Sequence, residues 1–187
     1  MEQKIFVVVL FLFFLIAALV PRIIQKRNKV ETVGCIGIKK EIFFLGKISL
    51  FTSFLLIPVQ LFIVNLSIFS TNEVFFWIGI VLFAIGVTFF TLAILGLGTF
   101  SLRVGLAHKD TALRTTGVYS ISRNPMLLGL YLMAIGSAIY VQNPINWLLV
   151  IIALAVHHKI ILVEEVFLEN RFGDKWIEYR NNVRRYI

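Results

Sequence analysis

Long runs of hydrophobic residues dominate the sequence, and short polar segments separate them. Five such runs stand out, at residues 5–20, 48–69, 74–98, 126–141 and 145–163. A helix needs about 20 residues to cross the hydrocarbon core of a bilayer, and about 17 is the lower limit. The second, third and fifth runs meet this length, while the first and fourth need residues from their flanks. Because lipid offers the backbone no hydrogen-bond partner, the runs are predicted to be helices.

The composition supports an all-α membrane protein. The chain has 187 residues, of which 59% are hydrophobic and 15% charged, whereas a soluble domain has about 45–50% apolar and about 25% charged residues. We predict one domain over residues 1–187, a polytopic membrane helix bundle of about five transmembrane helices. Residues 1–94 would supply the N-terminal spans and 95–187 the catalytic half. A poor cleavage site and a basic cluster after the first run favour a retained span over a signal peptide.

Lysine and arginine residues are concentrated in alternate loops. The segments after the first and third runs and the C-terminal tail are rich in them, whereas residues 70–73 and 142–144 have none. The positive-inside rule then places the N-terminus outside and the C-terminus in the cytosol. The net charge of +8 is thereby explained by membrane topology, and we predict no nucleic-acid partner. The short loops suit a prokaryotic plasma membrane, and the pattern determines no oligomeric state.

Several glycines lie within the third and fourth runs. Small residues let neighbouring helix backbones approach closely in a membrane, so we expect helix packing here rather than a direct functional role. These glycines are Gly79, Gly86, Gly96, Gly98, Gly129 and Gly136.

The polar segment 111–125 leads into the fourth run. Gly117 permits a turn, and Pro125 suits the first turn of a helix, where its missing N–H group costs nothing. Arg123 and Asn124 therefore lie at a helix start, whose free N–H groups favour an anionic or polar ligand. The alternative is that Arg123 only extends to the membrane surface as an anchor.

A second polar cluster ends the fifth run. His157 and Glu164 are seven residues apart, nearly two helical turns, as are His158 and Glu165, so each pair shares a helix face. Ionisable groups near membrane depth usually face a cavity or one another. Adjacent residues point about 100° apart, so at most one His–Glu pair faces any cavity, and we predict no metal site. A solvated helix end is the other interpretation, and the roles of both histidines stay open.

The C-terminal segment has an amphipathic helical pattern. Gly173 is expected to break the helix and Asp174 to cap its continuation. The segment is predicted to be a cytosolic helix, either lying on the bilayer or covering a site at the cytosolic end. Its apolar stripe consists of Leu168, Phe172, Trp176, Tyr179 and Val183.

Together these segments resemble the isoprenylcysteine carboxyl methyltransferase family, including its bacterial-type members. These are membrane enzymes that use S-adenosylmethionine, and they are similar to the phospholipid N-methyltransferases. The resemblance covers residues 95–187, about half the chain. It rests on Gly117-Val118-Tyr119, Arg123-Asn124-Pro125, Gly129, Glu164-Glu165, Leu168, Phe172-Gly173, Tyr179 and Val183-Arg184-Arg185.

Three positions depart from the family pattern. Asn124 stands where histidine is usual, and Leu127 stands where tyrosine is usual. Ile160 occupies a position that is basic in members acting on a carboxylate, although Lys159 is its neighbour. These departures leave the use of S-adenosylmethionine in place and weaken the case for a prenylcysteine carboxylate as acceptor.

The resemblance implies a cofactor site and two catalytic residues. Arg123 would hold a carboxylate of cofactor or substrate in a two-point contact, and Glu165 would be its catalytic partner. The methyl acceptor would be lipophilic or lipid-borne and would enter sideways from the membrane lipids. It could be a prenylcysteine-like carboxylate, a phospholipid amine, another lipid or a small thiol. The implied S-adenosylmethionine-binding residues are Leu113, Gly117, Tyr119, Arg123, Asn124, Pro125, Glu164 and Glu165.

Two other functional classes compete with this interpretation. A membrane reductase of the sterol-reductase kind has a similar catalytic half but uses NADPH, and this chain is short for that class. A non-enzymatic scaffold or a small transporter is the other alternative. Transporters more often show internal repeats and broken helices at mid-membrane, whereas the polar residues here cluster near one membrane face.

Overall fold

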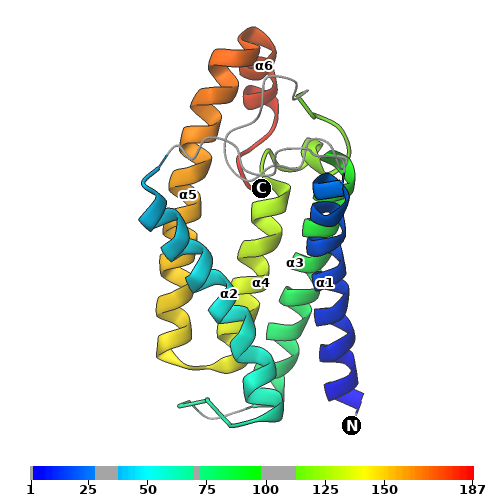
Figure 1. Ribbon diagram of the computed structural model, residues 1–187, viewed down its shortest axis with the longest axis vertical. Coiled ribbons are helices and arrows are strands. Elements are labelled where there is room, and N and C mark those ends of the chain that lie inside the picture. Colours follow the sequence, from blue (N-terminus) through cyan, green and yellow to red (C-terminus); the bar gives the residue numbers. More distant parts are fainter. Residues whose placement is uncertain (1, 28–37, 70–71, 98–112) are drawn as a thin grey trace.

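The computed structural model describes residues 2–27, 38–69, 72–97 and 113–187, and these residues form a helical bundle. The long helices α1 to α5 lie side by side and alternate in direction, with α2 running obliquely across the bundle (Figure 1). The described residues form no β-strand, which confirms the predicted all-α class. The elements are α1 (Glu2–Arg27), α2 (Lys40–Phe62), α3 (Glu73–Leu97), the 3₁₀ helix η1 (Gly117–Ser120), α4 (Pro125–Val141), α5 (Pro144–Phe172) and α6 (Asp174–Asn182).

The long helices carry the predicted membrane spans. Within the described residues, α2, α3, α5 and residues 4–21 of α1 are long and apolar enough to cross a bilayer. Helix α4 is also apolar, but its 17 residues fall just short of that length. The first span is longer than its apolar run, because α1 continues through Pro21 to Arg27. The prediction of a polytopic bundle is thus confirmed.

Two helix boundaries differ from the apolar runs. Helix α2 begins at Lys40, eight residues before the run at 48, and ends at Phe62 rather than at residue 69. At its start, Lys47 lies 4.3 Å from the ring centroid of Phe43, so a charged residue is accommodated within the helix. Helix α5 continues past residue 163 to Phe172, because a helix can leave the apolar region without ending. Hydrophobicity therefore located the spans better than it located the helix ends.

Helices α3 and α4 pack in the closest contact of the bundle through two glycine pairs. A Cβ atom added at Gly86 would lie 2.5 Å from the Gly129 carbonyl oxygen. One added at Gly79 would lie 2.7 Å from the Gly136 carbonyl oxygen. Both distances are shorter than any side-chain contact allows, so larger residues would push the two backbones apart. The packing role predicted for these four glycines is confirmed.

Helix α1 joins the bundle through aromatic side chains. Phe11 stacks on Phe83 of α3 at 5.3 Å between ring centroids. Phe14 meets Phe54 of α2 edge to face at 5.6 Å and lies 5.5 Å from the ring of Phe90. Such pairs contribute about 0.5–1.5 kcal/mol each beyond the area they bury. They position α1 against both neighbouring helices.

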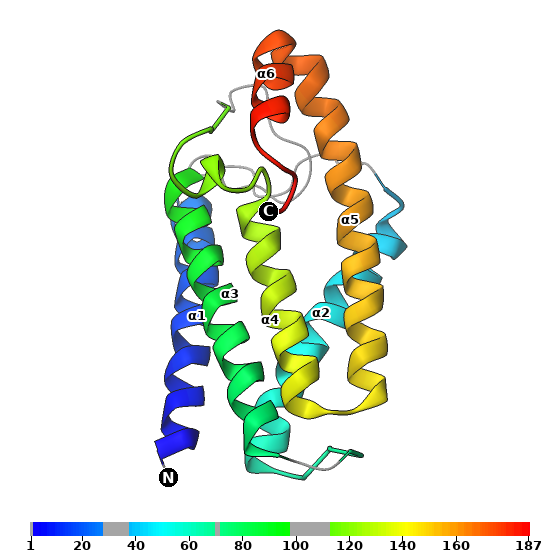
Figure 2. The same ribbon diagram turned by 180° about the vertical axis from the view of Figure 1, so that it is seen from behind.

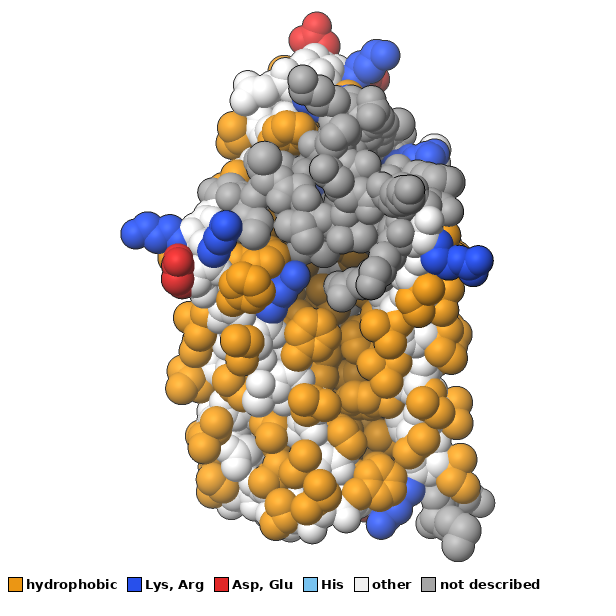
Figure 3. Space-filling model, viewed as in Figure 1, with side chains coloured by type: hydrophobic (Ala, Val, Ile, Leu, Met, Phe, Trp, Pro, Cys, Tyr) orange, Lys and Arg blue, Asp and Glu red, His pale blue; other side chains and the backbone are white. Residues whose placement is uncertain are grey.

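One end of the bundle is polar and holds the C-terminal residues. Charged side chains gather toward the end that carries α6, while hydrophobic side chains cover the helical body (Figure 3). Helices α4 and α5 are joined at the opposite end by a short turn and separate toward the polar end (Figures 1 and 2). Residues 183–187 run back from α6 into the space between them. The candidate site lies where this segment meets α4 and α5.

Candidate active site

A tight turn places Arg123 at the start of α4. Gly117 has φ +66°, a left-handed conformation that glycine adopts readily, and it opens η1. Ser122 is fully buried, and its hydroxyl group accepts a hydrogen bond from the Asn124 N–H group at 3.1 Å. Pro125 is the first residue of α4, as the sequence predicted. The turn therefore holds the Arg123 backbone against the end of the bundle.

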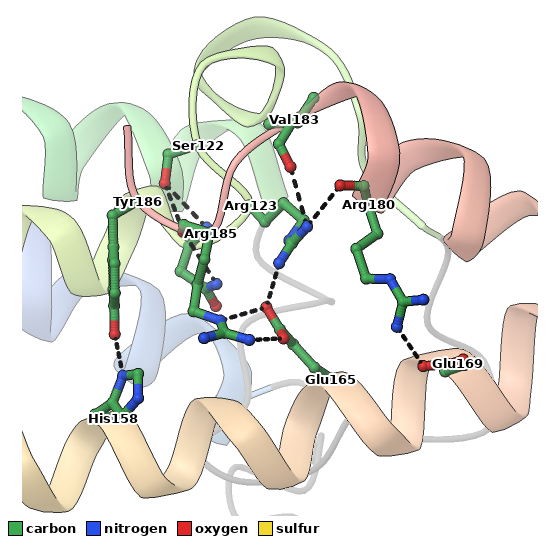
Figure 4. A network of polar contacts seen from close by, with 10 residues as sticks. Ser122, Arg123, His158, Glu165, Glu169, Arg180, Val183, Arg185 and Tyr186 are labelled. Atoms are coloured by element: carbon green, nitrogen blue, oxygen red, sulfur yellow. Dashed lines mark hydrogen bonds and ion pairs between the residues drawn. The ribbon is translucent and has the colours of Figure 1, made fainter.

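The Arg123 guanidinium group connects α4, α5 and the C-terminal tail (Figure 4). Its Nη2 atom donates to Glu165 Oε1 at 2.9 Å. Its Nη1 atom donates to the carbonyl oxygens of Arg180 at 2.8 Å and Val183 at 3.0 Å. The side chain is only 7% exposed. Arg123 is thus a buried structural centre rather than an anchor that extends to the membrane surface.

Glu165 receives a second guanidinium group, from Arg185. Arg185 Nε donates to Glu165 Oε1 at 3.0 Å, and Nη2 donates to Oε2 at 2.7 Å. This two-point geometry is the strong form of an arginine–carboxylate pair, and the carboxylate raises the pKa of Arg185 further. Two guanidinium groups thus share one carboxylate. The cluster Arg123–Glu165–Arg185, called the arginine centre below, therefore has a net positive charge.

The C-terminal tail is fixed to the same turn through its backbone. The Arg123 N–H group donates to the Arg184 carbonyl oxygen at 3.0 Å. The Arg185 carbonyl oxygen accepts from the Ser122 hydroxyl group at 3.2 Å and from Asn124 Nδ2 at 3.3 Å. Sequence reasoning named neither Arg185 nor Ser122 as a site residue, because Arg185 was used only as part of the family motif and as a topology signal, and Ser122 carried no signal of its own.

Helix α6 starts where the sequence predicted a break, but not through the predicted cap. Gly173 has φ +53° and ends α5, as expected. The N-cap of α6 is Gly173 itself, and Asp174 is the first helical residue, whose side chain forms no capping hydrogen bond. The expectation that Asp174 caps this helix was wrong, because a left-handed glycine already turns the chain there.

Aromatic residues join α6 to η1 beneath the arginine centre. The Tyr179 hydroxyl group donates to the Tyr119 carbonyl oxygen, and the Tyr119 hydroxyl group donates to the Ala93 carbonyl oxygen at 3.3 Å. Burial raises the pKa of Tyr119 and raises that of Tyr179 to about 12. Trp176 is 2% exposed, and the centroid of its ring lies 5.7 Å from the Arg123 guanidinium carbon. Both tyrosines are therefore neutral hydrogen-bond donors at ordinary pH.

The two glutamates of the predicted pair have different surroundings. Both oxygens of Glu165 are engaged by arginines, whereas no residue in the described part of the chain donates a hydrogen bond to Glu164. Glu164 is partly buried and close enough to Tyr119 to interact with it electrostatically. Leu113, the remaining predicted residue, is partly buried in the coil before η1.

The two neighbouring histidines also separate. His157 is buried, and its Nδ1 atom lies 2.7 Å from the Ala153 carbonyl oxygen. His158 Nδ1 lies 2.7 Å from the Tyr186 hydroxyl group, so His158 faces the tail, as Glu165 does. Among the residues that the structure describes, no three His, Cys, Asp or Glu side chains gather as a metal site would require.

Most of the residues that form this site lie in a segment that is similar to known proteins. The sequence model of the phospholipid methyltransferase family matches residues 74–175. That segment is more than half of the chain, and it runs from α3 into α6. The chain belongs to the phospholipid methyltransferase family. The family segment contains Arg123, Glu164 and Glu165, whereas Arg185 and the tail lie beyond it.

The chain is also similar to three known proteins. A protein-S-isoprenylcysteine O-methyltransferase of Saccharomyces cerevisiae is 40% identical over 75 residues, which are 40% of this chain and 31% of that protein. The enzyme of the same name from Schizosaccharomyces pombe is 32% identical over 77 residues, 41% of this chain and 33% of that protein. An uncharacterized protein of Haemophilus influenzae is 36% identical over 63 residues, 33% of this chain and 100% of its own length. The chain thus spans about a third of each yeast relative.

Proposed function

We propose that this protein is an S-adenosylmethionine-dependent methyltransferase that acts on a lipophilic acceptor at the cytosolic membrane face. The observation that carries the proposal is the Arg123–Glu165–Arg185 centre. It is largely buried, lies at the polar end of an apolar bundle, and has two of its three side chains in the family segment. A solvated helix end would not need two guanidinium groups on one carboxylate.

The unpaired polar atoms around this centre fit the amino-acid part of S-adenosylmethionine. Arg123 Nε and Trp176 Nε1 are buried donors without an acceptor among the described residues. Such atoms are costly to bury unpaired, and a carboxylate or hydroxyl group of a ligand would satisfy them. The Glu164 carboxylate, which has no donor in the described structure, suits an ammonium or hydroxyl group. Glu164 interacts electrostatically with Tyr119, which accepts a hydrogen bond from Tyr179 of the helix that carries Trp176. Donors and an acceptor therefore lie at the same end of the bundle, as a zwitterionic ligand requires.

The residues of the chain would align and shield the reaction. S-adenosylmethionine supplies a methyl group on a sulfonium, which is already reactive toward a nucleophile. The protein then has to hold that nucleophile in line and exclude water. We assign Glu164 and the Gly117–Tyr119 turn to holding the cofactor, with Leu113, Asn124 and Pro125 beside it. Arg123 and Glu165 would keep the tail and α4 in the geometry that this contact needs.

The acceptor would come from the bilayer. Most side chains on the outward faces of the helices are apolar, so a lipid-borne group can reach the polar end along them. The family is named for phospholipids, and the yeast relatives are named for S-isoprenylcysteine; both are lipophilic acceptors. A prenylcysteine-like carboxylate, a phospholipid amine and a small thiol are therefore the acceptors to compare.

The proposed orientation puts the site in the cytosol. The N-terminus and C-terminus lie at opposite ends of the bundle, and the C-terminus lies at the end where basic side chains gather (Figures 1 and 3). The positive-inside rule then places this end in the cytosol and the N-terminus outside. A prokaryotic plasma membrane suits the short loops.

Transfer of a labelled methyl group tests the proposal. The purified protein in lipid vesicles would be supplied with S-adenosylmethionine labelled in its methyl carbon. One sample would contain an S-prenylated cysteine, one an aminophospholipid, and one a long-chain thiol. Label in the organic phase that depends on both acceptor and protein supports the proposal. If no acceptor is labelled by protein that binds S-adenosylhomocysteine, the proposed lipophilic acceptor is wrong.

A further inference from the structure

The two arginines of the arginine centre use the same edge of the guanidinium group unequally (Figure 4). The Nε and Nη2 atoms form that edge, which matches the two oxygens of a carboxylate. Arg185 uses both atoms, with Nε donating to Glu165 Oε1 at 3.0 Å and Nη2 donating to Oε2 at 2.7 Å. Of this edge Arg123 uses only Nη2, which donates to Glu165 Oε1 at 2.9 Å. The Arg123 Nε atom is buried and has no acceptor among the described residues.

Arg185 explains why Arg123 Nε is left without an acceptor. A carboxylate has two oxygens and can span the Nε–Nη2 edge of one arginine at a time. Because Glu165 spans the edge of Arg185, it offers Arg123 only the oxygen that both arginines share. The Nη1 atom of Arg123 donates to the carbonyl oxygens of Arg180 and Val183 and so fixes the orientation of the group. The free Nε–H group is therefore a consequence of how Arg185 holds Glu165.

The tail keeps Arg185 in the position from which it holds Glu165. The Arg185 carbonyl oxygen accepts hydrogen bonds from the Ser122 hydroxyl group at 3.2 Å and from Asn124 Nδ2 at 3.3 Å. The Arg185 side chain is 34% exposed, compared with 7% for Arg123 and 11% for Glu165. Arg185 is thus the outer arginine of the centre, and Arg123 is the inner one.

A second buried donor lies beside Arg123. Trp176 Nε1 also lacks an acceptor in the described part of the chain, and the centroid of the Trp176 ring lies 5.7 Å from the Arg123 guanidinium carbon. Buried polar groups are nearly always hydrogen-bonded in folded proteins. Two unpaired donors next to each other, one of them charged, indicate a site for a ligand group that only accepts hydrogen bonds, such as a carboxylate.

We propose that Arg185 is a positioning residue that holds Glu165 and thereby keeps Arg123 Nε available for the carboxylate of S-adenosylmethionine. This inference rests on the cofactor proposed above. Without Arg185, Glu165 would turn and span the Nε–Nη2 edge of Arg123, because that edge offers a carboxylate two parallel hydrogen bonds. The ligand carboxylate would then lose its donor and meet the charge of Glu165. The tail, which lies beyond the family segment, thus determines whether the site accepts an anionic group.

Two ligands that differ only in the carboxylate test this role. S-adenosylhomocysteine has the carboxylate, and its decarboxylated analogue keeps the amine and the nucleoside. Calorimetric titration of the detergent-solubilised protein measures both affinities. Arg185→Ala should weaken binding of S-adenosylhomocysteine by roughly tenfold to a hundredfold, the effect of one charge-assisted hydrogen bond, and should leave binding of the analogue unchanged. Arg185→Lys should behave in the same way, because lysine keeps the charge but cannot hold both oxygens.

Arg184→Ala is the matched control. Arg184 is the neighbouring arginine of the tail, and its side chain is exposed and contacts no partner among the described residues. The substitution removes the same charge from the same segment, and both affinities should stay unchanged. Weaker binding of S-adenosylhomocysteine in this control, as in Arg185→Ala, would show that the charge of the tail matters rather than the grip on Glu165, and would overturn the inference.

The double variant Arg185→Ala with Glu165→Gln separates positioning from direct contact. Glutamine has one acceptor oxygen and cannot span the edge of Arg123. If Arg185 acts through Glu165, the double variant should bind S-adenosylhomocysteine more tightly than Arg185→Ala does. Equal or weaker binding, with the affinity for the analogue retained, would mean that Arg185 contacts the ligand itself and would overturn the inference.

The failures of the two proposals are distinguishable in the same titrations. A natural chain that binds neither ligand would overturn the proposed cofactor and this inference with it. Equal affinity of the natural chain for both ligands would leave the cofactor standing and overturn the inference alone. An equal loss of both affinities in Arg185→Ala would do the same, since a merely structural role of Arg185 would not distinguish the two ligands.

Discussion

Arg185 and Glu165 form a two-point pair, with Nε to Oε1 at 3.0 Å and Nη2 to Oε2 at 2.7 Å. They are twenty residues apart in sequence and lie on different elements, the tail and α5. Because Arg123 also donates to Oε1, Glu165 is occupied by the protein itself. The neighbouring Glu164 is therefore the carboxylate of the pair that is available to a ligand, and the two glutamates should respond differently to substitution.

Glu164→Gln should weaken cofactor binding without unfolding the protein. Losing one charge-assisted hydrogen bond costs about 1.5–3 kcal/mol, roughly a ten- to hundredfold loss of affinity. Calorimetric titration with S-adenosylhomocysteine measures it. Glu169→Gln is the control, since Glu169 lies on the same helix and pairs with an exposed Arg180. If Glu164→Gln binds S-adenosylhomocysteine with unchanged affinity, Glu164 does not hold the cofactor.

Glu165→Gln should act first on stability. Removing one partner of a buried ion pair costs about 3–5 kcal/mol, because the remaining charge is left without compensation. Here both Arg123 and Arg185 lose their carboxylate. We expect a lower thermal unfolding midpoint and faster trypsin cleavage after residues 184 and 185. Natural stability and an intact tail would show that the centre does not hold this segment.

Arg123→Lys should fail almost as badly as Arg123→Ala. The guanidinium group bonds a carboxylate and two carbonyl oxygens at once, and a lysine ammonium group cannot reproduce this planar arrangement. The measurement is methyl-transfer rate per folded protein, with Arg114→Lys as the control at an exposed arginine. Near-natural turnover of Arg123→Lys would remove Arg123 from the catalytic site but would leave the family membership intact.

Gly86→Ala should destabilise the bundle far from the site. The new Cβ atom would lie 2.5 Å from the Gly129 carbonyl oxygen, a backbone atom that cannot move aside alone. Forcing volume into a packed contact costs about 1–3 kcal/mol. Thermal unfolding in detergent measures the effect. Gly96→Ala is the milder comparison, because among the described residues its Cβ atom would meet only the Tyr119 ring, at 3.3 Å. Equal stabilities would contradict the close-packing account.

The sequence predicted the bundle and its polar end because both depend on local patterns. Apolar runs identified the spans, and the glycines of the third and fourth runs predicted the α3–α4 contact. Gly117 and Gly173 predicted the turns, since both adopt left-handed conformations. The start of α2 and the end of α5 were not predictable in this way, because a helix can extend through polar residues beyond an apolar run. The end of α2 at Phe62 was not predictable either, since the apolar run continues past it to residue 69.

The partners within the site required tertiary structure. The motif at Arg123 and the pair Glu164-Glu165 were visible in the sequence, but their connection through Arg185 was not. Arg185 is one of several tail arginines, and only the return of the tail between α4 and α5 brings it to Glu165. The contact of Tyr186 with His158 depends on the same return.

The proposed orientation can be checked with reporter fusions. A reporter at Asn72 should report the outer side, and one at the C-terminus should report the cytosol. The physical reason is the basic charge at the end of the bundle that carries α6. A cytosolic signal from the Asn72 fusion would contradict the proposed orientation and would place the arginine centre on the outer side of the membrane.

The central claim is that the polar end binds S-adenosylmethionine, and calorimetric titration of the detergent-solubilised protein tests it most directly. S-adenosylhomocysteine and NADPH would be titrated separately into the natural chain and into Arg123→Ala. The account predicts saturable binding of S-adenosylhomocysteine to the natural chain, much weaker binding to the variant, and no binding of NADPH. Binding of NADPH in its place would point to a reductase. Binding of neither ligand would contradict the account.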